Sequence, residues 1–110
     1  MSPVTSMVTT HVLDTARGRP AAGVPVLLLR GLRGDDRLAE AVTDADGRVG
    51  ELGPERVAPG AYRLVFDVAA WAGPDAFFPE VTIAFTVSEE RHHHVPLLLS
   101  PFGYSTYRGS

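Results

Sequence analysis

The residues of this 110-residue chain most suited to catalysis are its four histidines, three of which are consecutive. Imidazole titrates near neutral pH, so histidine readily takes or gives a proton in a catalysed reaction. His92, His93 and His94 enter an apolar, strand-like segment, where alternation places His92 and His94 on one face and His93 on the other. His11 lies inside another such segment. These side chains are candidates for acid–base chemistry; the alternative is a solvated entrance to a strand.

Metal ligation is a second chemistry that these histidines allow. His92, His94 and His11 would supply three imidazole ligands for zinc. The neighbouring sequence offers no evident carboxylates to orient them, so we expect no metal and no cofactor. The run Asp44-Ala45-Asp46-Gly47 is similar to part of a calcium loop. Val42 and Gly53 stand where its first and last carboxylates belong, so the run predicts a tight turn instead.

Other chemistries are excluded by what the chain lacks. It has no cysteine, which removes disulfides and thiolate catalysis, and no Gly-x-Ser-x-Gly motif for a serine nucleophile. The net charge of −3 and the scattered basic residues argue against nucleic acid. No apolar run is long enough to span a membrane. No secretory signal is visible either, and we expect a cytoplasmic protein.

The last four residues, Tyr107-Arg108-Gly109-Ser110, are rich in hydrogen-bonding groups. Chain ends are usually the least constrained part of a domain. Here the preceding residues carry apolar, proline and aromatic side chains, which predict an ordered segment. The ending therefore looks built to occupy a defined place.

The length and 45% hydrophobic content predict one globular domain over residues 1–110, with residues 1–6 flexible. Glycine and proline divide the chain into short β-like segments, typical of an antiparallel sandwich of about eight strands. The clearest alternation covers residues 61–68. Residues 67–71 predict the one helical turn, before Gly73 and Pro74. The expected strands cover residues 7–14, 24–29, 38–43, 48–52, 61–68, 81–87, 92–99 and 104–108.

Two of these expectations concern how strands pair. Residues 48–52 should return antiparallel to residues 38–43 after the turn at Asp44–Gly47. Residues 104–108 should form an edge strand, which is an aggregation liability unless something pairs with it. Pairing with the same strand of a second subunit would cover that edge and give a symmetric dimer.

Together, these segments resemble the transthyretin-like family of 5-hydroxyisourate hydrolases. The resemblance rests on five pieces in order along the chain: His11-Val12-Leu13-Asp14 with Gly18-Arg19-Pro20-Ala21, Thr43-Asp44-Ala45-Asp46-Gly47-Arg48, Phe77-Phe78-Pro79-Glu80, residues 94–101, and residues 104–110. It implies an all-β, two-sheet sandwich of eight strands with one short helix. It also implies a homotetramer whose sites lie in a central channel between subunits.

The resemblance places catalytic groups at His11, Arg48 and His94, with Tyr107, Arg108, Gly109 and Ser110 lining the same pocket. The implied reaction converts 5-hydroxyisourate to 2-oxo-4-hydroxy-4-carboxy-5-ureidoimidazoline in urate and purine breakdown. His93 departs from the family pattern, where an aromatic such as tyrosine is common; its side chain should point away from the channel.

The implied chemistry is attack of water on a ring carbonyl, with His11 or His94 as the base. Arg48 offers a fork of donors for the developing oxyanion, and Arg108 and Ser110 could hold the ring edge. Which histidine is the base stays open. The alternatives are a ligand carrier of the transthyretin type, which needs no imidazole at position 11, and a non-catalytic β-sandwich module.

Overall fold

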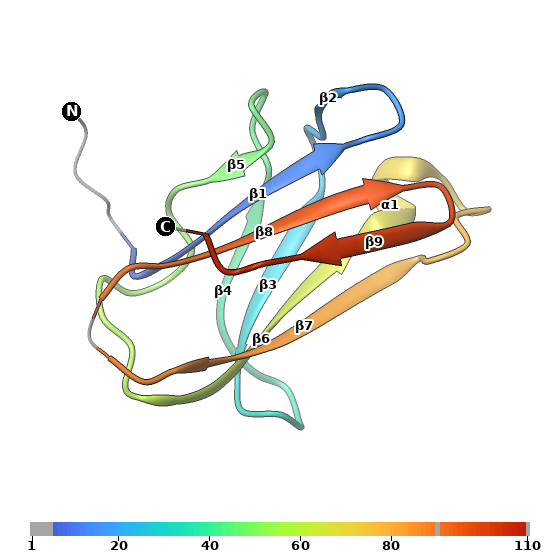
Figure 1. Cartoon of the computed structure of the whole chain (residues 1–110). Coiled ribbons are helices and arrows are strands. Elements are labelled where there is room, and N and C mark those ends of the chain that lie inside the picture. Colours follow the sequence, from blue (N-terminus) through green and yellow to red (C-terminus); the bar gives the residue numbers. More distant parts are fainter. Residues whose placement is uncertain (1–5, 90, 110) are drawn as a thin grey trace.

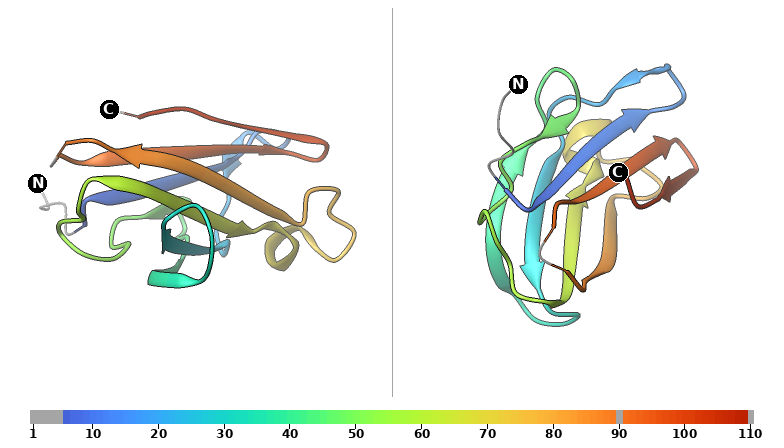
Figure 2. Two further views of the ribbon diagram at one scale, coloured as in Figure 1. Left: turned by 90° about the horizontal axis from the view of Figure 1, so that it is seen from below. Right: turned by 60° about the vertical axis from the view of Figure 1, so that its left-hand side comes forward.

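A computed structural model describes residues 6–89 and 91–109 as two β-sheets packed face to face (Figure 1). Edge-on, the sheets form two layers (Figure 2). Within these residues the elements are β1 (Val8–Asp14), β2 (Arg19–Pro20), β3 (Pro25–Arg30), β4 (Asp36–Val42), β5 (Arg48–Val49), β6 (Gly60–Asp67), α1 (Val68–Ala72), β7 (Glu80–Val87), β8 (His93–Ser100) and β9 (Gly103–Thr106). The predicted all-β sandwich with one short helix is confirmed.

The first sheet, called sheet A, has the order β2-β1-β8-β9, and β5 also pairs with β1. The second, sheet B, has the order β4-β3-β6-β7. Sheet B is antiparallel, but β1 and β8 run parallel at the centre of sheet A. An all-antiparallel arrangement was therefore wrong for this one pair. Because β1 and β8 are neighbours, residues 83 to 85 positions apart lie side by side.

The core lies between the sheets and follows the predicted alternation. Tyr62, Leu64 and Phe66 of β6 are buried, as are Val8 and Val12 of β1. From β8, the core receives Val95, Leu97 and Leu99. Thr9, His11 and His94 alternate with these buried residues and therefore lie on the opposite face of sheet A.

The return strand after the Asp44 turn pairs differently from the prediction. The Asp44 side chain accepts hydrogen bonds from the backbone N–H groups of Asp46 and Arg48, at 2.9 and 3.0 Å. Gly47 has φ 73° and its carbonyl accepts from Val12 N–H at 2.7 Å. This hydrogen bond joins the turn to β1, on the other sheet from β4. The strand that follows, β5, therefore pairs with β1 in sheet A rather than with β4 in sheet B.

Several boundaries also differ from those predicted. Ser6 lies in the segment 1–6 predicted to be flexible, but it is buried. Its hydroxyl donates to Val8 O at 2.8 Å and accepts from Leu52 N–H at 3.0 Å. The last strand is Gly103–Thr106 rather than residues 104–108. The predicted helical turn is confirmed, one residue later than expected, as α1 over Val68–Ala72. Asp67 caps its start by accepting a hydrogen bond from Ala70 N–H. In the part of the chain that the structure describes, no helix could cross a membrane.

Candidate active site on the outer face of sheet A

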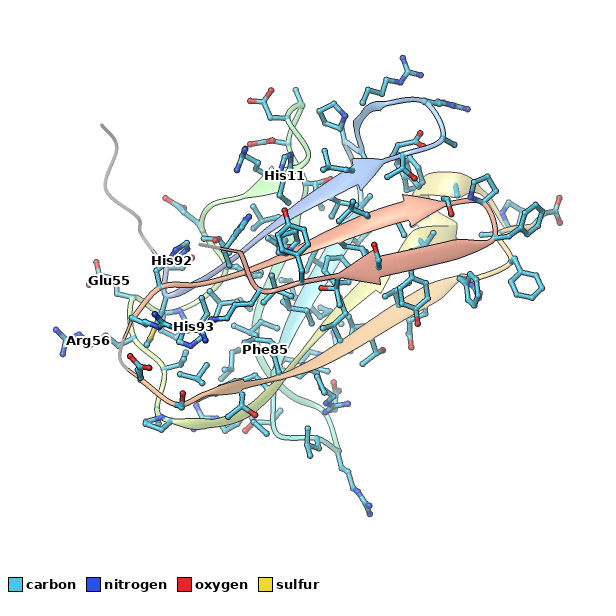
Figure 3. All side chains as sticks on the ribbon, viewed as in Figure 1. His11, Glu55, Arg56, Phe85, His92 and His93 are labelled. Atoms are coloured by element: carbon cyan, nitrogen blue, oxygen red, sulfur yellow. The ribbon has the colours of Figure 1, made fainter. Side chains whose placement is uncertain are left out.

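Strand register brings the three predicted catalytic residues to one region of sheet A. His11 of β1 lies opposite Arg48 of β5, and Thr9 of β1 lies opposite His94 of β8. Because Thr9 and His11 share a face of β1, the side chains of His11 and His94 lie on the same outer surface. Figure 3 locates His11 on β1 and His92 just before β8 (Figure 3). The prediction that separate strands bring these groups together is confirmed.

The three consecutive histidines separate as alternation predicts. His93 is 6% exposed, and its Nδ1 lies 2.6 Å from the carbonyl oxygen of Arg91. His92 and His94 lie on the outer face instead, and both contact the Thr9 hydroxyl. The rings of His92 and His94 stack at an interplanar angle of 23°. His93 therefore faces away from the candidate site, as expected.

The chain end packs on His94. Gly109 donates its backbone N–H to the carbonyl of His94 at 2.8 Å, in an isolated antiparallel bridge. A Cβ at position 109 would lie 2.5 Å from Cδ2 of the His94 ring, which is closer than atoms can approach. Only glycine fits here without moving the imidazole.

The surroundings of His94 keep its imidazole neutral. Burial lowers the pKa of His94 below its ordinary value of 6.5, and electrostatic interactions with His92, Arg48 and His11 lower it further. A backbone hydrogen bond with Thr9 acts weakly in the opposite direction. A neutral imidazole at pH 7 has a free lone pair, which is what a general base requires.

Of the other residues predicted at the chain end, Tyr107 and Arg108 are exposed and line a hollow of about 310 Å³ between the edge of sheet A and β7. His94 contributes to its lining, but so do His93 and Val95, which face away from the candidate site. His11 and Arg48 do not line that hollow. Ser110 lies outside the described residues. In the single chain, the candidate site is thus an open surface rather than a closed pocket.

A larger hollow, of about 400 Å³, lies at the other end of the molecule beside α1. Trp71, Phe77 and Phe102 line it, and none of the predicted site residues does. Among residues 6–89 and 91–109, no group of three or more His, Asp or Glu side chains is arranged to hold a metal. The imidazoles of His11 and His94 and the guanidinium of Arg48 on the outer face of sheet A offer acid–base and hydrogen-bonding chemistry.

Sequence reasoning missed Thr9. It is 8% exposed and its hydroxyl lies within hydrogen-bonding distance of two imidazoles. The signal was available in part, because alternation along residues 8–14 places Thr9 on the same face as His11. What the sequence does not reveal is the parallel pairing with β8, which brings the histidines to that face.

A two-sheet sandwich with histidines and an arginine on the outer face of one sheet defines a transthyretin-like protein with a polar site. The family model described as HIUase/Transthyretin matches residues 8–109. The chain belongs to this family. A 5-hydroxyisourate hydrolase of Deinococcus radiodurans is 50% identical over 113 residues, covering 93% of this chain and 94% of that protein.

Two solved structures show the same fold. A 5-hydroxyisourate hydrolase of Klebsiella pneumoniae superposes with a TM-score of 0.81 at 40% identity, over 96% of this chain and 99% of that one. Sea bream transthyretin in complex with thyroxine superposes with a TM-score of 0.83 at 31% identity, over 94% of each chain. The fold is thus shared by a protein named a hydrolase and by one solved in complex with thyroxine, so the fold alone does not define the function.

Proposed function

We propose that this chain is an enzyme that hydrolyses 5-hydroxyisourate to 2-oxo-4-hydroxy-4-carboxy-5-ureidoimidazoline in urate breakdown. The observation that carries the proposal is the meeting of His11, Arg48 and His94 on the outer face of sheet A. The relatives named 5-hydroxyisourate hydrolase, at 40 to 50% identity and with nearly full coverage, support the same substrate.

His94 is the general base in this proposal. Its lowered pKa leaves the imidazole neutral at pH 7, ready to take a proton from the attacking water. The water oxygen bonds to the ring carbonyl carbon, and the carbon–nitrogen bond of the ring then breaks. His11 is placed to orient the water or to return a proton to the leaving nitrogen.

Arg48 stabilises the charge that develops on the carbonyl oxygen. Its guanidinium presents a planar fork of donors that matches a carbonyl or oxyanion. The turn at Asp44 and the pairing of β5 with β1 fix its backbone opposite His11. The positive charge also favours the neutral form of His94, so Arg48 supports the base as well as the oxyanion.

The chain end binds the substrate ring in this proposal. Gly109 is held against His94 by a backbone hydrogen bond. Tyr107 and Arg108 directly precede Gly109 in the chain. Ser110, the next residue, lies outside the described residues, and its part in binding the substrate stays a prediction. No cofactor takes part in the proposed reaction.

A homotetramer with sites between subunits completes the proposal. The outer face of sheet A is open, and a second surface facing it would exclude bulk solvent while retaining the one water that attacks. Strands β9 and β7 are the edges of their sheets and offer unpaired backbone groups for joining copies. Phe102 and Tyr104, beside that edge, are 81% and 44% exposed. The cytoplasmic location stays a prediction.

The alternative is a small-ligand carrier, as the thyroxine complex of sea bream transthyretin illustrates. A carrier for an apolar ligand gains little from clustered imidazoles and a guanidinium, which carry a desolvation cost. The neutral His94 beside Arg48 fits catalysis better.

The experiment is a stopped-flow absorbance assay with 5-hydroxyisourate generated freshly by uricase. We expect the purified chain to accelerate substrate loss far above the spontaneous rate, with saturation kinetics. Loss at the spontaneous rate, from a folded tetramer, would contradict the enzyme and favour the carrier.

A further inference from the structure

The Thr9 hydroxyl is held between two imidazoles. Its Oγ1 lies 2.7 Å from Nε2 of His92 and 2.8 Å from Nδ1 of His94. The two rings are nearly parallel, with centroids 6.1 Å apart. Thr9 is almost fully buried, whereas His92 is exposed and His94 half-buried. The three side chains thus form a line from solvent, through Thr9, to the proposed base.

Counting protons limits what this line can be. A threonine hydroxyl has one hydrogen to donate, and its oxygen can accept from other donors. If both contacts are hydrogen bonds and the hydroxyl hydrogen is used, one imidazole nitrogen accepts from Thr9 and the other donates to it. Either His94 carries its hydrogen on Nδ1 and His92 accepts at Nε2, or the reverse holds. The tautomers of the two histidines are therefore linked.

The packing of His94 decides which arrangement suits a base. Thr9 occupies Nδ1, and Gly109 packs against the Cδ2 edge of the ring. Nε2 is then the ring nitrogen left for a substrate water. For Nε2 to accept a proton from that water, the hydrogen of the neutral ring must be on Nδ1.

We propose that Thr9 and His92 are positioning residues that hold His94 in the tautomer with its hydrogen on Nδ1, so that Nε2 is free to act as the base. In this arrangement His94 Nδ1–H donates to Thr9, and the Thr9 hydroxyl donates to His92 Nε2. When His94 takes a proton at Nε2, its Nδ1–H keeps the same acceptor and orients the imidazolium. This inference rests on the proposed function for its catalytic consequence, but the tautomer itself does not depend on substrate.

The first test compares Thr9→Val with Thr9→Ser. Valine keeps the shape of threonine without the hydroxyl, and serine keeps the hydroxyl. We expect Thr9→Val to lower kcat by about tenfold with KM little changed, because the base loses its orientation. Thr9→Ser should stay within about threefold of wild type, because it retains the hydroxyl. Equal kcat values for both variants and the wild type would overturn the positioning role.

The second test changes the hydrogen-bond acceptor that His92 offers to the Thr9 hydroxyl. His92→Gln retains an acceptor for the Thr9 hydroxyl, whereas His92→Phe retains a ring but accepts nothing. In His92→Phe the Thr9 hydroxyl has lost this acceptor, so its hydrogen is free to turn to His94 Nδ1, and the preference for a hydrogen on Nδ1 of His94 is lost. We expect His92→Phe to lose most of the activity that His92→Gln keeps. Matching activities would overturn the role of His92.

Long-range ¹H–¹⁵N NMR of the histidine rings reads the tautomer directly. At pH 8, wild type and Thr9→Ser should show a protonated Nδ1 and an unprotonated Nε2 for His94, and Thr9→Val should lose that preference. A wild-type His94 with its hydrogen on Nε2 would overturn the inference. If wild type shows the expected tautomer but does not hydrolyse 5-hydroxyisourate, the assignment of the hydrogen bonds stands and the proposed function fails.

Discussion

At the scale of single residues, His94 is where the constraints on this molecule meet. Thr9 holds one edge of its ring, Gly109 packs on another, and Arg48 and His11 act on it through their charges. A side chain held from so many directions loses little entropy when substrate binds and keeps one nitrogen in place. This favours His94 over His11 as the base, a choice that the sequence leaves open.

The lowered pKa of His94 predicts a definite pH dependence. If neutral His94 is the base, as proposed, kcat/KM should be constant above about pH 7 and fall as the pH drops through the lowered pKa, below 6.5. In that same interval the unfolded chain binds more protons than the native chain, so stability also falls with falling pH. Arg48→Gln should raise the pKa of His94, as seen by NMR titration. A His94 midpoint at or above 6.5 in wild type would contradict this account.

Gly109 offers a steric test of the contact with His94. In Gly109→Ala the new Cβ would lie 2.5 Å from Cδ2 of the imidazole, so the ring or the chain end must move. We expect activity to fall by roughly tenfold to a hundredfold, since small misplacements of catalytic groups have effects of that size. The melting temperature should change little.

Gly103→Ala is the matched control, because its new Cβ meets its nearest neighbour, Ser100 Oγ, at 3.4 Å, an ordinary contact. Equal activity of the two alanine variants would show that the packing of Gly109 on His94 is unimportant.

At the scale of elements, the sequence predicts more of the fold than of its connections. Alternation in β6 and β8 places the core and separates His93 from its neighbours, because a strand alternates whatever it pairs with. Pairing is different, since it depends on contacts between distant residues. The crossing of β5 to β1 depends on a hydrogen bond from Val12 to Gly47, and β1 runs parallel to β8 over a long sequence separation. Local sequence patterns predict neither the pairing of β5 with β1 nor the parallel pairing of β1 with β8.

Substituting Gly47 tests how the fold positions Arg48. A Cβ at position 47 would lie 2.3 Å from the carbonyl oxygen of Val12, and φ is +73°. We expect Gly47→Ala to lower the free energy of unfolding by roughly 3 kcal/mol, through backbone strain and overpacking. Urea denaturation measures this change, and activity should fall as β5 shifts.

Gly18→Ala provides the control for that substitution. Gly18 has a similar φ of +68° but no heavy atom within 4 Å of its added Cβ, so only the backbone strain, about 1 kcal/mol, should remain. An equal loss of stability in both variants would show that the contact with β1 does not matter.

At the scale of the whole molecule, assembly of several copies would account for both the unpaired edge strands and the open site. Sheet A ends at β9 and sheet B at β7, and the candidate site lies on the outer face of sheet A. Joining copies through these edges would cover the exposed aromatic side chains, and stacking two such pairs with the outer faces of sheet A together would enclose the site. Analytical ultracentrifugation should therefore give the mass of a tetramer.

Removing residues 107–110 separates the chain end from the rest of the fold. Strand β9 ends at Thr106, so the truncated chain should keep its two sheets, measured by circular dichroism. Activity should be lost, because the contact of Gly109 with His94 is gone. A C-terminal tag should also reduce activity, whereas an N-terminal tag should not. A fully active truncated protein would show that the chain end is only structural.

The most direct test of the central claim is the turnover of fresh 5-hydroxyisourate by His94→Asn. Asparagine can still form hydrogen bonds but cannot act as a base near neutral pH. We predict an intact tetramer whose turnover is reduced on the order of a hundredfold or more, the range expected for loss of a general base. Near-normal turnover by an intact tetramer would contradict the account.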